Sequence, residues 1–268
     1  MLKDITLGQY FPGNSPIHRL DPRTKLIWLI GYIVALFTAG NWASYLVVFL
    51  FLAFVVALST IPLKSILTGL KPLVFILIFT GVLNVFFTTG EKPLIAFGVI
   101  RIYREGIIRA VFMMARIFML ICGTFLLTYT TSPISLTDGL ESLLSPLKKL
   151  RLPVHELSMM MCIALRFIPT LIEETDKIMS AQKARGADFE SGKLMQRVKA
   201  LIPILVPLFI SAFRRADELA TAMECRCYQG GDGRTKMKLL RFSYFDFVAL
   251  GIGALLIAAV SVLAHFGL

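Results

Sequence analysis

Histidine and cysteine are scarce in this sequence, and the few present are not spaced as metal ligands. His18, His155 and His265 are dispersed along the chain. Of the four cysteines, Cys225 and Cys227 stand closest together, but one intervening residue is too tight for the usual zinc knuckle. We therefore expect no metal site, and thiols that stay reduced because they face a cytosol.

The chain also lacks nucleotide-binding and hydrolytic motifs. No GxxxxGK sequence followed by Ser or Thr occurs, so we do not expect the chain to bind ATP through a phosphate-binding loop. Residues 230–235 are rich in glycine, but they follow a predicted helix rather than a strand and are interpreted as a flexible connector. No Ser/His/Asp arrangement or pair of carboxylates stands out. We therefore predict that the chain is not an enzyme and carries no cofactor.

We expect no secretory signal peptide, because residues 1–25 are charged and have no apolar stretch before the first hydrophobic segment. The alternation typical of β-barrel strands is also missing. What the chain does contain is hydrophobic: 56% of its residues, with a mean hydropathy of +0.75. Runs of about 20 apolar residues recur, which is the length of a membrane-spanning helix. The sequence therefore predicts an all-α integral membrane protein.

We predict five membrane-spanning helices, at about residues 26–39, 42–61, 72–88, 106–129 and 245–266. Asp21 and Pro22 precede the first helix and are typical of an N-cap and a first helical residue. The predicted spans divide the chain into three parts. These are an N-terminal membrane region with four spans (1–130), a cytoplasmic region (131–243) and a C-terminal span (244–268).

The position of the positive charges, more than their net excess of +11, predicts the orientation. Region 131–243 holds 17 of the 28 Lys and Arg residues, and the tail after the last span holds none. Because basic residues favour the cytoplasmic side, we place the N-terminus and region 131–243 in the cytoplasm and the C-terminus outside. The loop at 89–105 fits least well, since it carries basic residues to the outside.

Two arginines fall inside the fourth predicted span. Arg109 and Arg116 are seven residues apart and therefore lie on one helix face. Arg109 is close enough to the outer surface for its side chain to reach it. Arg116 lies deeper, where an unpaired charge is costly, so we expect it to face protein and to pair with an acid or a backbone carbonyl. The alternative is a direct role in transport.

Two long amphipathic stretches occupy the cytoplasmic region. Apolar residues recur in steps of three and four from Leu157 to Met179, and again from Leu194 to Met223, which indicates one face of a helix in each case. Neither apolar stripe can lie free in water, so each must be buried on the other stretch, on the bilayer surface or on another subunit. Internal prolines are expected to bend both helices, and a shorter helix is expected at about 135–150.

Each long stretch ends at an arginine in a similar setting. The two triplets are Ala184-Arg185-Gly186 and Cys225-Arg226-Cys227, the second with Gly230 and Gly231 just beyond. Taken alone, each arginine is explained by an ordinary helix end, where a basic side chain offsets the helix dipole by about 0.3–1 kcal/mol. The repetition favours two docking points for soluble partners, because the planar fork of arginine binds carboxylates or carbonyls bidentately.

Four segments together resemble one family. They are 15–25 (Ser-Pro-Ile-His-Arg-Leu-Asp-Pro-Arg-Thr-Lys), 165–169 (Leu-Arg-Phe-Ile-Pro), 181–186 (Ala-Gln-Lys-Ala-Arg-Gly) and 214–220 (Arg-Arg-Ala-Asp-Glu-Leu-Ala). Their combination is similar to the transmembrane T component of energy-coupling factor (ECF) vitamin transporters, from about residue 7 to 265. The resemblance implies a scaffold in a prokaryotic plasma membrane that joins a membrane-embedded, substrate-binding S component to two cytosolic ATPases.

The resemblance also implies roles for individual residues. In this family two coupling helices carry an Ala-Arg-Gly signature, or a close variant, whose arginines dock into grooves on the two ATPases. The matching residues here are Ala184, Arg185 and Gly186 for the first helix, and Cys225, Arg226 and Cys227 for the second. The second triplet departs from the family pattern, because cysteines flank its arginine. ATP would be bound by the partner ATPases, and no nucleic acid is expected.

We further expect an apolar seam on the coupling helices to contact the S component or the partner helix and to transmit the movement of the ATPases. The seam residues are Leu157, Met161, Leu165, Ile168, Leu201, Leu205, Leu208 and Ala212. The methionines of these helices either fill gaps in a core or form an adaptable binding face.

Functions of other classes stay open at this point. A permease subunit of a conventional ATP-driven importer would need a polar substrate path, whereas the first three spans hold almost no charge. A membrane enzyme acting on a lipid would need clustered acids or histidines, and a passive scaffold would have no link to ATP. The sequence does not name the imported vitamin, a choice that belongs to the S component in this family. We expect a module shared by several S components.

Overall fold

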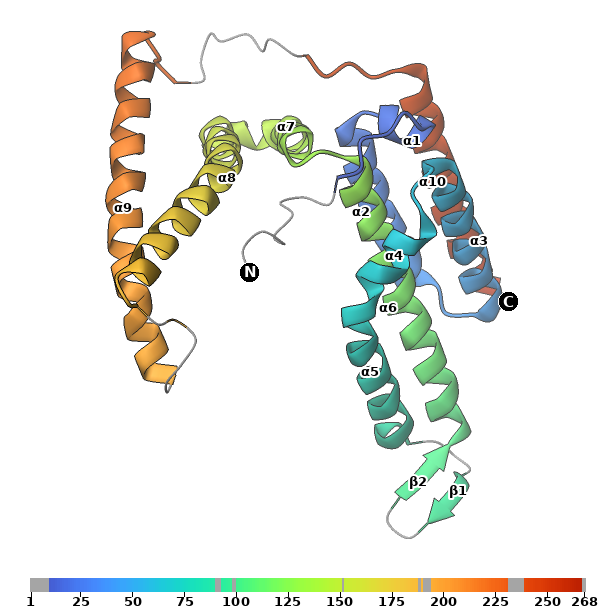
Figure 1. Cartoon of the computed structure of the whole chain (residues 1–268). Coiled ribbons are helices and arrows are strands. Elements are labelled where there is room, and N and C mark those ends of the chain that lie inside the picture. Colours follow the sequence, from blue (N-terminus) through green and yellow to red (C-terminus); the bar gives the residue numbers. More distant parts are fainter. Residues whose placement is uncertain are drawn as a thin grey trace. The chain divides into compact units, whose positions relative to one another are not determined.

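The structure is a computed structural model that describes residues 10–89, 93–97, 100–150, 152–187, 189, 194–230 and 239–266. The chain forms two compact units (Figure 1). The membrane unit consists of Gly8–Gly139 and Leu240–Leu268, and the helix-pair unit contains Leu140–Leu239. The glycine-rich connector of the sequence analysis lies outside the described residues from position 231 onward.

The membrane unit is built around four helices: α2 (Pro22–Thr38), α3 (Trp42–Ser59), α6 (Arg104–Thr130) and α10 (Tyr244–Phe266). Although α10 comes last in the chain, it packs along α2, and α2 in turn packs against α6. Their shared core is apolar and includes Leu36, Val48 and Val260, which are almost fully buried. Many of the remaining side chains on these helices are apolar and exposed, as expected where hydrocarbon rather than water surrounds them.

The predicted start of the first span is confirmed. Helix α2 begins at Pro22, and the Asp21 side chain caps it by accepting a 2.9 Å hydrogen bond from the Arg23 backbone N–H. The short helix α1 (Pro16–Arg19) precedes it and is capped in the same way by Ser15.

A bent helical ridge follows α3. It consists of α4 (Leu63–Leu70), the 3-10 helix η2 (Lys71–Leu73) and α5 (Val74–Phe87). The sequence analysis read residues 62–71 as a loop, whereas most of this segment is helical. Helix α5 packs against α6, and Gly81 permits a close approach, because a Cβ there would meet Met114 Sδ at 2.8 Å.

The connection between α5 and α6 was expected to be a plain loop, and this is wrong. It contains an antiparallel hairpin of β1 (Pro93–Phe97) and β2 (Ile100–Tyr103), paired from Pro93 with Tyr103 to Phe97 with Ile100. The signal was present in the sequence: β-branched and aromatic residues run through 94–103 around Gly98. Apart from this hairpin, the described fold is all-α.

Five helical segments of the described chain are long and apolar enough to span a membrane. Four agree with predicted spans: α3, Leu63–Phe87, α6 and Tyr244–His265. The fifth is α8 (Val154–Ala184), whose mean hydropathy of 1.3 is well below the 2.2–2.6 of the others. Helix α2 has 17 residues and falls just short in length. The chain is therefore a multi-pass helical membrane protein.

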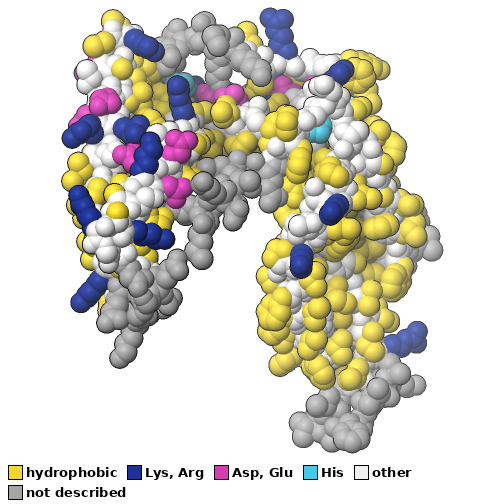
Figure 2. All heavy atoms as spheres, in the orientation of Figure 1, with side chains coloured by type: hydrophobic (Ala, Val, Ile, Leu, Met, Phe, Trp, Pro, Cys, Tyr) yellow, Lys and Arg dark blue, Asp and Glu magenta, His cyan; other side chains and the backbone are white. Residues whose placement is uncertain are grey.

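The helix-pair unit contains α8 and α9 (Leu194–Cys225). Helix α7 (Pro133–Leu144) leads into it and is followed by the 3-10 helix η3 (Ser145–Leu150). The single helix expected over 135–150 is therefore wrong in its second half, where Pro146 removes a backbone donor. Charged side chains gather over α8 and α9, whereas hydrophobic side chains cover the visible face of the membrane unit (Figure 2).

Candidate functional site

Helices α8 and α9 contact each other and run in opposite directions (Figure 1). Near the end of α8, Gln182 Nε2 donates to the Pro203 carbonyl of early α9 at 3.4 Å. Further back on α8, the Glu174 carboxylate accepts hydrogen bonds from Ser211 Oγ and from Arg215 Nη2, the latter at 3.1 Å. Because earlier residues of α8 meet later residues of α9, the pair is antiparallel.

This arrangement separates the two helix ends that carry the arginines. Arg185 lies about 16 Å along α8 from Glu174, and Arg226 lies about 22 Å along α9 from Ser211, at about 1.5 Å per residue. Since the helices are antiparallel, the two arginines lie on opposite sides of the contact. The site therefore presents two separate positive ends rather than one basic cluster.

The end of α8 is a Schellman turn with Arg185 in the C-cap position. The Gly186 N–H donates to the Lys183 carbonyl and the Ala187 N–H donates to the Gln182 carbonyl, both at 3.0 Å. Gly186 has φ +85°, which is the left-handed conformation that this turn requires and that glycine adopts without a Cβ clash.

The end of α9 has the same geometry around Arg226. The Cys227 N–H donates to the Glu224 carbonyl at 2.8 Å, and the Tyr228 N–H donates to the Met223 carbonyl at 3.0 Å. Cys227 takes the place of Gly186 and has φ 55°. The left-handed residue that closes this turn is thus Cys227. The sequence analysis noted Gly230, which lies three positions later and does not close the turn.

The two arginines are therefore equivalent by structure as well as by sequence. Both occupy the C-cap of a long helix, immediately before a left-handed residue, and both side chains are exposed. Among the described residues, neither side chain makes a hydrogen bond or an ion pair with the rest of the chain. Each is available to an external carboxylate or carbonyl.

The predicted seam residues are only partly covered within the chain. Leu165, Ile168, Leu208 and Ala212 are half-buried, and Leu157, Met161, Leu201 and Leu205 are exposed. Among the α9 side chains that the structure describes, the buried one is Ile204, which the sequence analysis missed although it lies at helical spacing from Leu208.

A second apolar stripe of α9 is fully open. Ile202, Val206, Phe209 and Phe213 follow steps of three and four, and each is more than half exposed. A stripe of this kind is not stable against water, so it requires a membrane or another protein.

The α8–α9 contact is polar at its centre. The spacing of apolar residues in the sequence did not predict this polar contact. Glu174 interrupts the apolar stretch of α8, and the hydrogen bond from Ser211 together with the nearby Arg215 lowers its pKa. At the other end of α8, Glu141 of α7 accepts from Ser158 at 2.9 Å and pairs with His155 at 3.1 Å. These carboxylates position α8 against its two neighbours.

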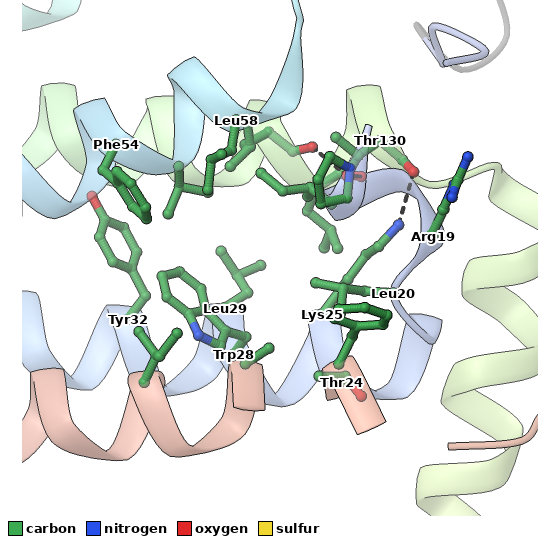
Figure 3. A pocket seen from close by; sticks show the side chains of 18 of the residues that line it. Arg19, Leu20, Thr24, Lys25, Trp28, Leu29, Tyr32, Phe54, Leu58 and Thr130 are labelled. Carbon is green, nitrogen blue, oxygen red and sulfur yellow. Dashed lines mark hydrogen bonds between the residues drawn. The ribbon is translucent and has the colours of Figure 1, made fainter. Parts of the chain in front are cut away.

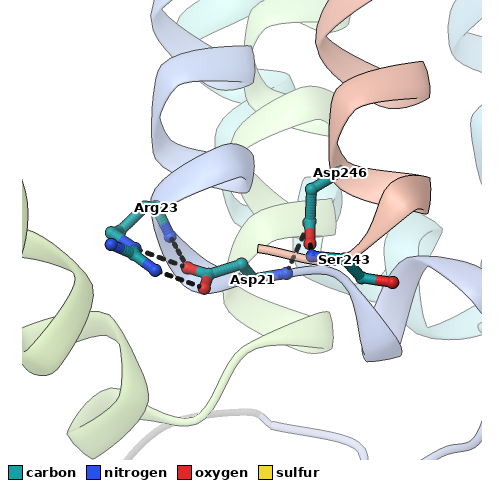
Figure 4. Close-up of polar contacts among 4 residues, drawn as sticks. All are labelled: Asp21, Arg23, Ser243 and Asp246. Carbon is teal, nitrogen blue, oxygen red and sulfur yellow. Dashed lines mark hydrogen bonds and ion pairs between the residues drawn. The ribbon is translucent and has the colours of Figure 1, made fainter. Parts of the chain in front are cut away.

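A further polar cluster lies where α2 and α10 begin (Figure 4). Asp246 accepts hydrogen bonds from the backbone N–H groups of Asp21 at 2.8 Å and Ser243 at 2.7 Å. Arg23 pairs with Asp21 at 2.9 Å and stacks over the Phe242 ring at 4.0 Å. The N-terminal segment 15–25 therefore fastens the last helix to the first.

No group of three or more metal-ligating side chains gathers within the described part of the chain. The cysteines at 225 and 227 are exposed free thiols on either side of Arg226.

The sequence was compared with known proteins. The family model "CbiQ: Cobalt transport protein" matches residues 13–237. The chain is 55% identical to the energy-coupling factor transporter transmembrane protein EcfT of Clostridium kluyveri over 266 residues, which cover 99% of this chain and 98% of the relative. It is 55% identical to EcfT of Ruminiclostridium cellulolyticum, covering 94% of both chains. It is 52% identical to EcfT of Bacillus subtilis, covering 90% of this chain and 91% of the relative.

These relatives are named as transmembrane subunits of a transporter rather than as enzymes, and they match along nearly the whole chain. The membrane helices and the two long terminal-arginine helices lie within the matched range. The chain therefore belongs to the CbiQ cobalt transport protein family, as one of its energy-coupling factor transporter transmembrane proteins, EcfT.

Proposed function

We propose that this chain is the scaffold and energy-coupling subunit of an ATP-driven micronutrient importer. In this proposal Arg185 and Arg226 dock on two cytosolic ATPase subunits, and α8 and α9 transmit the movement of these ATPases to a membrane-embedded S component. The observation that carries the proposal is the matching position of the two arginines, each at the C-cap of a turn closed by the same two hydrogen bonds. ATP is bound by the partners, and the chain itself performs no catalysis.

The turn geometry supports the docking role. At each helix end, two backbone N–H groups close the turn. They donate to the carbonyls of Gln182 and Lys183 on α8, and to those of Met223 and Glu224 on α9. The helix end is therefore a rigid support for the arginine and not a frayed terminus. Ala184 and Gly186, and likewise Cys225 and Cys227, are small enough to let a partner surface approach the guanidinium closely.

Coupling requires that the partner complex prefers one arrangement of α8 and α9 over another, since contact alone shifts no equilibrium. The contact between the two helices is limited to a polar centre and a few half-buried apolar residues. Such a contact tolerates a change of crossing angle better than a packed apolar core does. The exposed stripe of α9 is the surface that we assign to the S component or the membrane.

The proposal includes an orientation. We place the N-terminus and residues 131–243 in the cytoplasm and the C-terminus outside, with α8 lying in the cytoplasm although its length and composition would allow it to span. The supporting observation is the charge of its second half, where acids and lysines follow from Glu173 onward.

The test is co-purification of the ATPases with arginine variants of the tagged chain. Arg185→Ala and Arg226→Ala should each weaken recovery of the ATPases, and the double variant should abolish it. Arg214→Ala, which removes an exposed charge from the middle of α9, is the matched control and should recover both ATPases normally. Normal recovery with the double variant would refute the docking role.

A further inference from the structure

The membrane unit contains a cavity that the coupling function does not use (Figure 3). Its volume is about 650 Å³, inside the range of roughly 300–1,000 Å³ that is typical of small-molecule sites. Residues of α2, α3, α6 and α10 line it together with α1. Most of the wall is apolar and includes Trp28, Leu29, Phe51, Phe54 and Leu58.

One end of the cavity is basic. Arg19 and Lys25 are the only charged residues that line it among those the structure describes, and no carboxylate faces it. Lys25 is 7% exposed and donates to the carbonyls of His18 (3.3 Å) and Thr130 (2.9 Å) and to Thr131 Oγ1 (3.2 Å). An ammonium group has three donors, so these neutral acceptors satisfy its hydrogen bonds without cancelling its charge.

The carboxylates that act on Lys25 electrostatically are Asp21 and Asp246. Neither lines the cavity, and both have other partners: Asp21 pairs with Arg23, and Asp246 accepts two backbone N–H groups. The Arg19 side chain is exposed and makes no hydrogen bond or ion pair within the described chain. The guanidinium is therefore free to bind a phosphate, for which its fork geometry is suited.

The apolar wall is open on the side that faces the bilayer. Phe54, Phe245 and Ile252 line the cavity and are 57%, 72% and 45% exposed. The basic end lies where α2 and α10 begin and α3 and α6 end, which is one surface of the membrane. An apolar trough that opens to hydrocarbon and ends in cations at the membrane surface matches an amphiphile with an anionic head.

We infer that this cavity binds an anionic phospholipid, with an acyl chain against Trp28 and Phe54 and the phosphate at Arg19, supported by the charge of Lys25. Free inorganic phosphate would not account for the apolar walls. A lipid held at this point touches α2, α3 and α10 together, so it would act as a removable part of the packing between the first and last helices.

Trp28 makes the proposal measurable, because the chain has only two tryptophans and Trp42→Phe leaves Trp28 as the single reporter. The full chain is reconstituted in phosphatidylcholine vesicles that contain brominated phosphatidylglycerol or brominated phosphatidylcholine at equal mole fraction, and quenching of Trp28 is measured. We expect brominated phosphatidylglycerol to reach half-maximal quenching at a mole fraction about fivefold lower than brominated phosphatidylcholine does. This is the preference expected from one basic residue near an anionic headgroup.

Four variants locate the effect. Arg19→Gln should remove the preference for phosphatidylglycerol, whereas Lys64→Gln, which removes an exposed charge outside the cavity, should keep it. Ala249→Phe fills the cavity and should reduce quenching by both lipids. In the Trp28→Phe variant, Trp42 reports on a different surface and should show no preference. Far-UV circular dichroism checks that each variant stays folded.

The proposal is overturned by equal quenching with the two lipids, by a preference that survives Arg19→Gln, or by undiminished quenching in Ala249→Phe. Absence of quenching at Trp28 by either lipid would also overturn it, since the cavity would then be closed to lipid. Inorganic phosphate should relieve the quenching no more than chloride at the same ionic strength does. Specific relief by phosphate would identify an anion site instead.

Discussion

At the scale of single residues, Arg116 shows how a charge is held inside a membrane helix. Its Nη2 donates to the Ala39 carbonyl at 3.1 Å, and its guanidinium lies 5.4 Å and 5.8 Å from the ring centroids of Phe37 and Tyr45. Ala39 is the C-cap of α2, so its buried carbonyl has no partner within its own helix. The expectation of a carbonyl partner is confirmed, and Arg116 fastens the turn between α2 and α3 to α6.

Arg116→Met should therefore destabilise the chain by about 1–3 kcal/mol, the usual cost of leaving a buried carbonyl unsatisfied. The measurement is thermal unfolding of the purified chain in detergent. Arg109→Met is the matched control, because Arg109 is exposed on the same helix face, and it should change stability by less than about 0.5 kcal/mol. Equal unfolding of the two variants would show that the Ala39 contact contributes nothing.

The left-handed residues that close α8 and α9 allow a paired prediction. Cys227→Gly removes a Cβ from a residue at φ 55° and should stabilise its turn by about 1 kcal/mol, whereas Gly186→Ala should weaken the other turn by a similar amount. Hydrogen exchange of the donors reports each change locally: the amides of Cys227 and Tyr228 in one turn, and of Gly186 and Ala187 in the other. Unchanged exchange in Cys227→Gly would contradict the strain argument.

At the scale of elements, the contact between α8 and α9 depends on Glu174. Ser211 and Arg215 lower the pKa of this carboxyl below its ordinary value of 4.5. Because the pKa of Glu174 is lower in the folded chain, its ionised carboxylate stabilises the folded helix pair fully above pH 4.5. This stabilisation is lost as the pH falls through the lowered pKa. The pair is partly exposed, so its contribution should be modest, about 0.2–1 kcal/mol.

We predict that Glu174→Gln at pH 7 loosens the helix pair in the same way as acidification of the parent does. Spin labels on α8 and α9 would show a broader distance distribution in the variant at neutral pH and in the parent near pH 3. Glu173→Gln, which changes the exposed neighbouring acid, should keep the narrow parent distribution. A narrow distribution in Glu174→Gln would mean that apolar packing alone holds the pair.

At the scale of the whole molecule, the proposed orientation makes the end of α9 cytoplasmic. In a Cys122→Ser and Cys162→Ser background, Cys225 and Cys227 are the remaining thiols and both are exposed. A membrane-impermeant maleimide should label them in inside-out vesicles and not in intact cells. Leu268→Cys in a cysteine-free background should show the opposite pattern. Labelling of Cys225 and Cys227 in intact cells would reverse the orientation.

The local properties of this protein followed from its sequence. Hydrophobic length and helix-start signals such as Asp21 and Pro22 located the spans, although the helical start of the third at Leu63 was missed. The Arg-Gly and Arg-Cys ends marked where α8 and α9 stop. These features depend on backbone capping and hydropathy, which act within one turn or one helix. The hairpin at 93–103 was also local, and its β-branched residues were a signal that the loop interpretation overlooked.

Only the tertiary structure decided the contacts between residues that are distant in the sequence. The fold pairs Arg116 with the Ala39 carbonyl, 77 positions away. It also pairs Glu174 with Ser211 and Arg215 of α9, which are 37 and 41 positions away. It also brought α2, α3, α6 and α10 together around the cavity with Arg19 and Lys25 at one end. Periodicity identifies which face of a helix is apolar, but it does not specify which helix covers that face, because many partners bury the same area equally well.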